Sequence, residues 1–322
     1  MFLLGLDIGG TKCAAVLGRK GAAPQDLIVD RIAFPTRPER GWRAVLDEAM
    51  DACRTLLARH GVADGDLDGI GVSCGGPLDA ERGVILSPPN LPGWDAVPVT
   101  DILQKAFGVR AVLRNDADAC ALAEWRYGAG RGTRNMIFLT FGTGMGAGLI
   151  LNGALYSGTN GLAGEVGHLR LAADGPLGYG KHGSFEGFCS GGGIVNLTRL
   201  RAEEYIQQHK ESLLLPNGAL SPDLSAATVA QALAQGDALA REVLTESAEK
   251  LGEGLAVLVD VFAPERIVIG SIYARNEAFF APIARDKMER EALSQSADAC
   301  EIVPAALGDA IGDYAALGVW EE

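Results

Sequence analysis

Several features are scarce or missing in this chain of 322 residues. Its six cysteines are scattered and form no CxxC pair, which excludes a zinc ribbon or a disulfide framework and favours a reducing compartment. Basic residues are few, because 28 Lys and Arg stand against 41 Asp and Glu, a formal net charge of −13. Nucleic-acid backbones are bound by clustered Lys and Arg, so this balance argues against a nucleic-acid partner.

A long apolar run is also missing. The apolar residues 1–6 are interrupted by Asp7 and lack a basic flank, so they are too short for a membrane span or a signal peptide. We therefore expect a cytoplasmic protein without a membrane partner. With 48% apolar and 21% charged residues, the composition is that of a globular protein, and its length allows one extended core or two packed domains.

Apolar periodicity indicates an α/β fold. Short apolar runs predict strands at Phe2–Leu6, Cys13–Leu17, Leu27–Phe34, Gly69–Ser73, Ala111–Arg114, Asn135–Phe141, Gly148–Leu151 and Arg266–Ile269. Helical spacing of apolar residues predicts helices from Trp42 to near Gly61 and over Ile194–His209, Thr228–Gln235, Asp237–Phe262 and Asn276–Glu291. Strands followed by alternating helices and strands indicate a sheet covered by helices rather than a helical bundle.

One local pattern occurs twice. The segments LLGLDIGGTKCAAVL at 3–17 and MIFLTFGTGMGAGLIL at 136–151 both predict a strand, a glycine turn and a second strand. We interpret this repeat as a duplicated domain with a cleft between the copies. Clusters of glycine such as these are typical of tight turns or of close approach to a ligand.

The first glycine turn only partly matches a known phosphate-binding motif. It has the glycine spacing of a Walker loop, but Thr11 and Lys12 stand in reversed order and a strand follows. A glycine hairpin can still present backbone N–H groups to phosphate oxygens, with Asp7 holding hydrated Mg²⁺ and Thr11 donating its hydroxyl. The alternative is two plain tight hairpins, although the repetition favours phosphate binding. Lys12 either neutralises phosphate charge or is simply exposed, so we leave it out of the catalytic set.

Six motifs together resemble the ROK family of sugar kinases and repressors. They are DIGGTK at 7–12, SCGGPLD at 73–79, NLPGW at 90–94, NDADACALAE at 115–124, FGTGMGAGL at 141–149 and GLAGEVGH at 161–168. The resemblance covers roughly residues 2–320 and implies the actin-like ATPase fold, in which duplicated ribonuclease-H-like domains close around ATP and a hexose. We expect a small α/β domain over residues 1–115, joined by a C-terminal helix at 305–322, and a large α/β domain over 116–304.

The resemblance assigns the chemistry to an aspartate that follows a short predicted strand. Transfer of a γ-phosphoryl group to a sugar needs a carboxylate within hydrogen-bond reach of the accepting hydroxyl. By resemblance, Asp116 is this catalytic residue and Asn115 binds a neighbouring sugar hydroxyl. Taken alone, the residues favour a different interpretation, in which Asn115 or Asp116 only caps the helix that follows.

The resemblance also implies the remaining site residues. The further sugar-binding residues would be Gly75, Gly76, Asn90, Glu165, His168 and Glu186. Beside Asp7 and Thr11, the nucleotide-binding residues would be Gly9, Gly10, Thr143, Gly144, Gly270 and Ser271. The segment SGGGI at 190–194 opens a predicted helix, and its glycines either supply further phosphate-binding amides or only relieve packing.

One loop departs from the family pattern. After the GEVGH motif many ROK proteins carry CxCGxxGCxE, whose cysteines bind a structural zinc together with the His of the motif. This chain has LGYGKHGSFE at 177–186, which places Leu177, Tyr179 and Ser184 at the cysteine positions. A structural zinc site needs four ligands, usually thiolate or imidazole. We therefore expect no zinc, with consequences for loop rigidity and sugar specificity rather than for the ATP chemistry.

These features imply an ATP- and Mg²⁺-dependent kinase, and by resemblance a homodimer, that phosphorylates a hexose such as glucose or an N-acetylhexosamine, at O6. The hexose stays open among glucose, N-acetylglucosamine, N-acetylmannosamine, fructose and allose. A ROK repressor is a weaker match, because only six residues precede Asp7 where its winged-helix domain would stand. The altered loop keeps open a catalytically silent, sugar-binding sensor of the same family.

Overall fold

The computed structural model describes residues 1–321 and divides the chain into two compact units. Unit 1 comprises Met1–Gly132, Leu155–Gly161 and Ala306–Glu322, and unit 2 comprises Thr133–Ala154 and Leu162–Ala305. This division differs from the boundary expected after residue 115. The reason is that α4 (Asp116–Tyr127) packs on α12 (Ile311–Gly318) inside unit 1, through small residues such as Ala119, Ala123 and Ala315.

Unit 1 is built on a five-stranded sheet of order β3-β2-β1-β4-β7. The strands are β1 (Phe2–Ile8), β2 (Lys12–Arg19), β3 (Ile28–Pro35), β4 (Leu67–Cys74) and β7 (Ala111–Asn115). The β1–β2 and β2–β3 pairs are antiparallel, whereas β1–β4 and β4–β7 are parallel.

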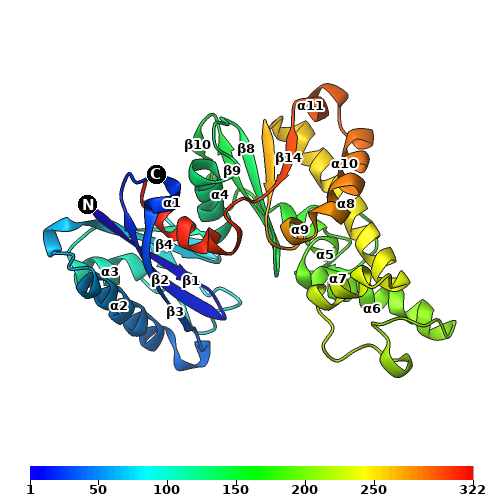
Figure 1. The fold of residues 1–322 in the computed structure, drawn as a ribbon, viewed down its shortest axis with the longest axis horizontal. Coiled ribbons are helices and arrows are strands. Elements are labelled where there is room, and N and C mark those ends of the chain that lie inside the picture. Colours follow the sequence, from blue (N-terminus) through cyan, green and yellow to red (C-terminus); the bar gives the residue numbers. More distant parts are fainter. Residues whose placement is uncertain (322) are drawn as a thin grey trace. The chain divides into compact units, whose positions relative to one another are not determined.

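Helices cover both faces of this sheet, because the side chains along β1 alternate between two cores. Leu4, Leu6 and Ile8 belong to a core with α2 (Trp42–Arg59) and α3 (Val99–Phe107). Leu3 belongs to the opposite core, where it clusters with α1 (Pro24–Leu27) and α12. Figure 1 shows α2 and α3 together beside the blue strands of this unit.

Unit 2 repeats the same sheet order, β10-β9-β8-β13-β14. Its strands are β8 (Met136–Phe141), β9 (Met145–Leu151), β10 (Ala154–Leu155), β13 (Arg266–Ile269) and β14 (Glu301–Pro304). Its helices are α5 (Phe185–Phe188), α6 (Gly191–Gln207), α7 (Ala226–Ala234), α8 (Ala238–Phe262), α9 (Ser271–Arg275), α10 (Glu277–Glu291) and α11 (Ser294–Asp298). In both sheets an antiparallel glycine hairpin precedes two parallel strands, which agrees with the predicted duplication.

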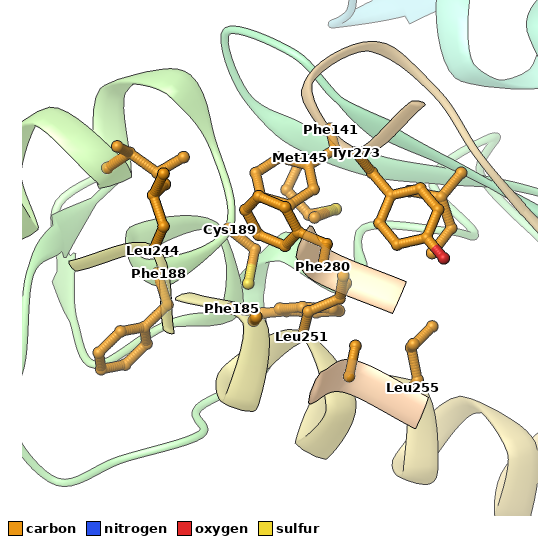
Figure 2. Packing of buried hydrophobic residues seen from close by; sticks show 14 of the residues in the cluster. Phe141, Met145, Phe185, Phe188, Cys189, Leu244, Leu251, Leu255, Tyr273 and Phe280 are labelled. Carbon is orange, nitrogen blue, oxygen red and sulfur yellow. The ribbon is translucent and has the colours of Figure 1, made fainter. Parts of the chain in front are cut away.

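Aromatic and aliphatic side chains fill the core of unit 2. Phe141 and Phe280 meet edge to face with ring centroids 5.5 Å apart, and Phe185 packs close to them from α5, as Figure 2 shows. The core fixes β8 against α5 and α10, and the glycine turn after β8 is thereby held on a rigid base. None of the helices within residues 1–321 is long and apolar enough to cross a bilayer.

Two small hairpins lie outside the two main sheets. One pairs β5 (Leu78–Asp79) with β6 (Val84–Ile85) in unit 1, and the other pairs β11 (Leu177–Gly178) with β12 (Lys181–His182) in unit 2. The latter is formed by the loop that departs from the family pattern.

Candidate active site

Three parallel strands of unit 1 end at one edge of the sheet. Ile8 of β1 pairs with Cys74 of β4, and Cys74 pairs with Asn115 of β7. The residues that follow these strands therefore come together, and they are Gly9 and Gly10, Gly75 and Gly76, and Asp116. In open α/β sheets ligands bind outside the carboxyl ends of the strands. The register alone thus gathers the predicted catalytic residue and two pairs of predicted glycines.

Asn115 and Asp116 occupy different positions at the start of α4. Asn115 is the N-cap, and its Oδ1 accepts the N–H of Ala117 at 2.9 Å. Asn115 therefore caps α4, and its contact with a sugar hydroxyl stays a prediction. Asp116 is the first helical residue and its side chain is exposed, although its Oδ1 also accepts from Ala117 N–H. Surrounding protein atoms partly desolvate this carboxylate and raise its pKa, while the Ala117 N–H opposes the shift.

The first glycine turn is closed by a hydrogen bond from Gly9 N–H to Lys12 O at 3.1 Å. Asn90 lies directly against this turn, because a Cβ added at Gly10 would be 2.6 Å from the Cβ of Asn90. Two predicted groups, the sugar-binding Asn90 and the nucleotide-binding turn, are thus neighbours in unit 1. Thr11 and Lys12 are both exposed.

Thr36 supports the first turn and was not found from the sequence. Its buried hydroxyl donates to Gly9 O at 2.6 Å, and its N–H donates to Thr11 O at 2.9 Å. The only signal in the sequence is a Thr placed just after the strand that pairs with β2. A bond of this kind is visible only once the register of β2 and β3 is known.

Asp7, the second-last residue of β1, has an environment that disfavours its ionised form. Burial raises its pKa to about 6, and the negative charges of Asp116 and Asp313 add to the shift, while Lys12 and Arg31 oppose it. Carboxylates crowded in this way are a favourable environment for a divalent cation. Mg²⁺ is commonly held by one or two carboxylates, waters and substrate phosphates, so the residues present fit the hydrated Mg²⁺ expected beside Asp7.

The second glycine turn, after β8, is braced by the start of α6. Gly191 N–H donates to Gly142 O at 2.7 Å, and Gly192 N–H donates to Thr143 O at 3.5 Å. The next amide, of Gly193, donates to the N-cap oxygen Ser190 Oγ at 2.9 Å. These bonds argue against the expectation that the segment 190–194 supplies amides to phosphate. These N–H groups already have acceptors, and they position the turn.

Predicted nucleotide residues of unit 2 surround this turn. Ser271 begins α9 in the left-handed region, with φ of 53°, and its Oγ lies 3.7 Å from where a Cβ on Gly142 would stand. A positive φ at a residue other than glycine is uncommon and is found preferentially at functional sites. Thr143 and Gly144 of the turn and Gly270 with Ser271 are therefore brought together.

Glu186 also reaches the second turn. Its Oε2 accepts the N–H of Met145 at 3.1 Å and lies 2.9 Å from the Cβ position of Gly144. Gly167 is wedged nearby, because a Cβ there would be 2.3 Å from Met145 O and 3.2 Å from Glu186 Cβ. Its neighbours in the GEVGH motif, Glu165 and His168, are exposed. Of the predicted sugar-binding residues of unit 2, Glu186 thus contacts Gly167, and Glu165 and His168 flank Gly167 in the sequence.

The β11–β12 hairpin holds His168 through direct contacts. The rings of His168 and Tyr179 meet edge to face with centroids 5.2 Å apart, and Lys181 Nζ donates to His168 O at 2.6 Å. The hairpin is tied further by His182 Nδ1–H, which donates to Gly175 O at 2.9 Å. No group of three or more His, Cys, Asp and Glu able to hold a metal ion is found within the described residues 1–321. The absence of zinc stays a prediction.

The repeated strand order and the paired glycine hairpins define an actin-like ATPase fold, as predicted. The chain belongs to the ROK family, whose model matches residues 3–322. It is 34% identical to a glucokinase of Halalkalibacterium halodurans, covering 96% of this chain and 92% of that one. A xylose repressor of Caldicellulosiruptor bescii is 31% identical, covering 70% of this chain but 54% of the repressor.

A solved structure agrees with this assignment. The crystal structure of a ROK family glucokinase from Streptomyces griseus, in complex with glucose and AMPPNP, superposes with a TM-score of 0.76 at 30% identity and covers 98% of each chain. The similarity therefore extends over both units of this chain.

Proposed function

We propose that this protein is an ATP- and Mg²⁺-dependent kinase that transfers the γ-phosphoryl group of ATP to O6 of a hexose, such as glucose or an N-acetylhexosamine. The glucokinase relatives support the reaction class. The observation that carries the proposal is the exposed carboxylate of Asp116, which stands where three strands end and beside the first glycine turn.

The phosphates are assigned to the two glycine turns. In unit 1, Gly9, Gly10 and Thr11 would contact phosphate oxygens, and Asp7 would hold Mg²⁺ through water. In unit 2, the corresponding residues are Thr143 and Gly144, with Gly270 and Ser271 flanking the adenosine. Mg²⁺, when bound, neutralises charge on the phosphate oxygens. Because the chain carries a net charge of −13, this neutralisation and the backbone amides offset a repulsive field.

The sugar is assigned to polar side chains that can pair its hydroxyls. Asp116 orients the O6 hydroxyl and accepts its proton as the oxygen attacks, and a raised pKa suits a group that must take up a proton. Gly75 and Gly76 let the backbone approach the ring. The remaining hydroxyls are assigned to Asn90, Asn115, Glu165, His168 and Glu186, since a buried hydroxyl left unpaired is costly.

A panel of hexoses and N-acetylhexosamines, assayed by coupled ADP release, tests this proposal. We expect turnover of at least one sugar and a loss of about 10²–10⁴-fold in kcat for Asp116→Asn, the range typical of a general base, with ATP binding retained. Asp101→Asn is the matched control, because Asp101 is an exposed carboxylate in the first turn of α3. Nearly normal turnover by Asp116→Asn would refute the assignment.

A second function, a catalytically silent sugar-binding regulator, is suggested by the xylose repressor relative and by the altered 177–186 loop. The glucokinase of H. halodurans is matched over 92% of its length, against 54% for the repressor, which favours the kinase. Calorimetric binding of a hexose without turnover of any sugar in the panel would favour the regulator.

A cytoplasmic location, a homodimer and the lack of a nucleic-acid partner stay predictions, and light scattering of the purified protein tests the dimer.

A further inference from the structure

Glu124 on α4 is a completely buried carboxylate that accepts hydrogen bonds from backbone amides. Oε2 accepts from Ala129 N–H at 2.7 Å and from Ala306 N–H at 3.2 Å, and Oε1 accepts from Leu307 N–H at 2.9 Å. Burying a charge is expensive unless such partners satisfy it. A fully buried Glu with three amide donors therefore indicates that the side chain holds these backbone segments in place.

The three amides lie where the chain passes from one unit to the other. Unit 1 first gives way to unit 2 after Gly132, and the chain returns to unit 1 for Leu155–Gly161 and finally at Ala306. Glu124 is thus bonded to the first and the last crossing segments, 128–132 and 306–307, which are called the two crossings below. Its backbone oxygen also accepts from Gly128 and Gly130. A Cβ at Gly128 would lie 2.1 Å from Glu124 Oε2, so the first segment is packed directly on this carboxylate.

Unit 2 holds the other ends of the same crossings. Glu265 Oε2 accepts from Arg134 N–H at 2.6 Å and from Asn135 N–H at 2.7 Å. Ala305 N–H donates to Ile269 O at 3.0 Å, as an extension of the β13–β14 pairing. In the sequence, Gly132 lies between the residues bonded to Glu124 and those bonded to Glu265, with φ of 85° and open space where a Cβ would be. The first crossing is therefore held by a carboxylate on either side of Gly132.

We propose that Glu124 is a positioning residue that fixes both crossing segments to the helix carrying Asp116. This inference rests on the proposed function of Asp116. The two residues are eight positions apart on α4, a separation of about 12 Å at 1.5 Å per residue. Because α4 is a rigid rod at this length and packs on α12, any displacement of the crossings is transmitted to Asp116 at its other end.

Glu124→Gln tests the inference. A carboxamide keeps one acceptor oxygen, but its NH₂ group faces an amide N–H, so at least one of the three amides loses its acceptor. We expect hydrogen exchange at Ala129, Ala306 and Leu307 to accelerate at least tenfold in the substrate-free protein. We expect kcat for the sugar to fall at least tenfold, while KM for ATP changes less than twofold.

Asp237→Asn is the matched control. Asp237 is also buried and accepts two backbone amides, those of Leu213 and Ala240 at 2.7 and 2.8 Å, but all of these groups lie within unit 2. We expect this variant to keep wild-type kcat at a temperature below the melting point of both variants. A general loss of stability would affect the two variants alike, whereas a positioning role affects only Glu124.

Equal kcat values for the two variants, or unchanged exchange at the crossing amides, would overturn the inference. If Glu124→Gln does not fold, Glu124→Asp keeps the charge with a shorter reach, and the same exchange and kcat changes are expected at smaller size. Should the wild-type protein phosphorylate no sugar, the proposed function fails. The exchange data then decide by themselves whether Glu124 holds the crossings.

Discussion

At the residue scale, Asp7 shows how an unfavourable environment for a carboxylate can favour the binding of a cation. Its carboxylate is partly buried and faces the charges of Asp116 and Asp313, and its pKa rises to about 6. Without a bound cation, the protonated form of Asp7 is therefore favoured only below about pH 6. A cation beside Asp7 would stabilise the charged form, so metal binding at about pH 6 or below would release a proton from Asp7.

The raised pKa predicts a pH dependence of stability. Between pH 3.8, the ordinary pKa of an aspartate, and about pH 6, its pKa in the folded chain, the native state binds more protons at Asp7 than the unfolded state does. The contribution of Asp7 to the free energy of unfolding is therefore lost as pH rises through this window. Asp7→Asn has no titrating group at this position, so its stability relative to wild type should increase by up to about 3 kcal/mol from pH 4 to 7.

Urea unfolding of both proteins at several pH values, without Mg²⁺, measures this difference. Asp101→Asn, which changes an exposed carboxylate, should give a profile parallel to that of the wild type. Parallel profiles for Asp7→Asn and wild type would show that the pKa of Asp7 is not raised.

At the scale of elements, the β11–β12 hairpin is held by ordinary contacts. Lys181 and His182 donate to backbone oxygens of the neighbouring segments, and Tyr179 packs on His168. Ser184, at one of the family's cysteine positions, instead caps α5 by accepting from Gly187 N–H at 3.1 Å. These contacts give the segment around His168 a support that does not depend on a metal.

Chelation tests this interpretation. Dialysis of the purified protein against EDTA, followed by return of Mg²⁺, should leave the melting temperature and the sugar kinase activity unchanged. Elemental analysis before dialysis should find far less than one zinc per chain. A lower melting temperature that only zinc restores would contradict the prediction, because structural zinc sites contribute directly to folding energy.

The ring of Tyr179 is expected to orient His168. An aromatic contact of this kind contributes about 0.5–1.5 kcal/mol, so Tyr179→Ala should raise KM for the sugar by roughly twofold to tenfold. KM for ATP should not change. Tyr179→Phe keeps the ring and should behave as wild type, and an equal rise in KM for both variants would assign the effect to the hydroxyl instead.

At the scale of the whole molecule, local patterns predicted much of the fold. The two glycine hairpins were found because turn chemistry is encoded in adjacent residues, and α8 and α10 start within one residue of their predicted positions. The placement of α4 was missed, since it depends on packing against α12, which is nearly two hundred residues away. Thr36 and Glu124 escaped notice for the same reason, because each bonds residues distant in sequence.

The net charge of −13 predicts how the association rate of the proposed nucleotide depends on salt. MgATP is an anion, so the long-range field of the chain opposes its association, and salt screens that field. Its association rate should rise severalfold between about 20 and 200 mM salt, opposite to the usual behaviour of steered ligands. Stopped-flow binding of a fluorescent ATP analogue measures the rate. A rate that falls with salt would show that local positive potential dominates.

The bracing of the second glycine turn by α6 has one more consequence. The 17-residue helix carries a macrodipole whose positive end points at the carbonyls of Gly142 and Thr143. When a carbonyl oxygen accepts a hydrogen bond from the N-terminus of a helix, its peptide group becomes more polarised. The N–H of that same peptide group is then a stronger hydrogen-bond donor. An acidic chain can thereby keep a region of positive potential at this turn without any lysine or arginine in the turn itself.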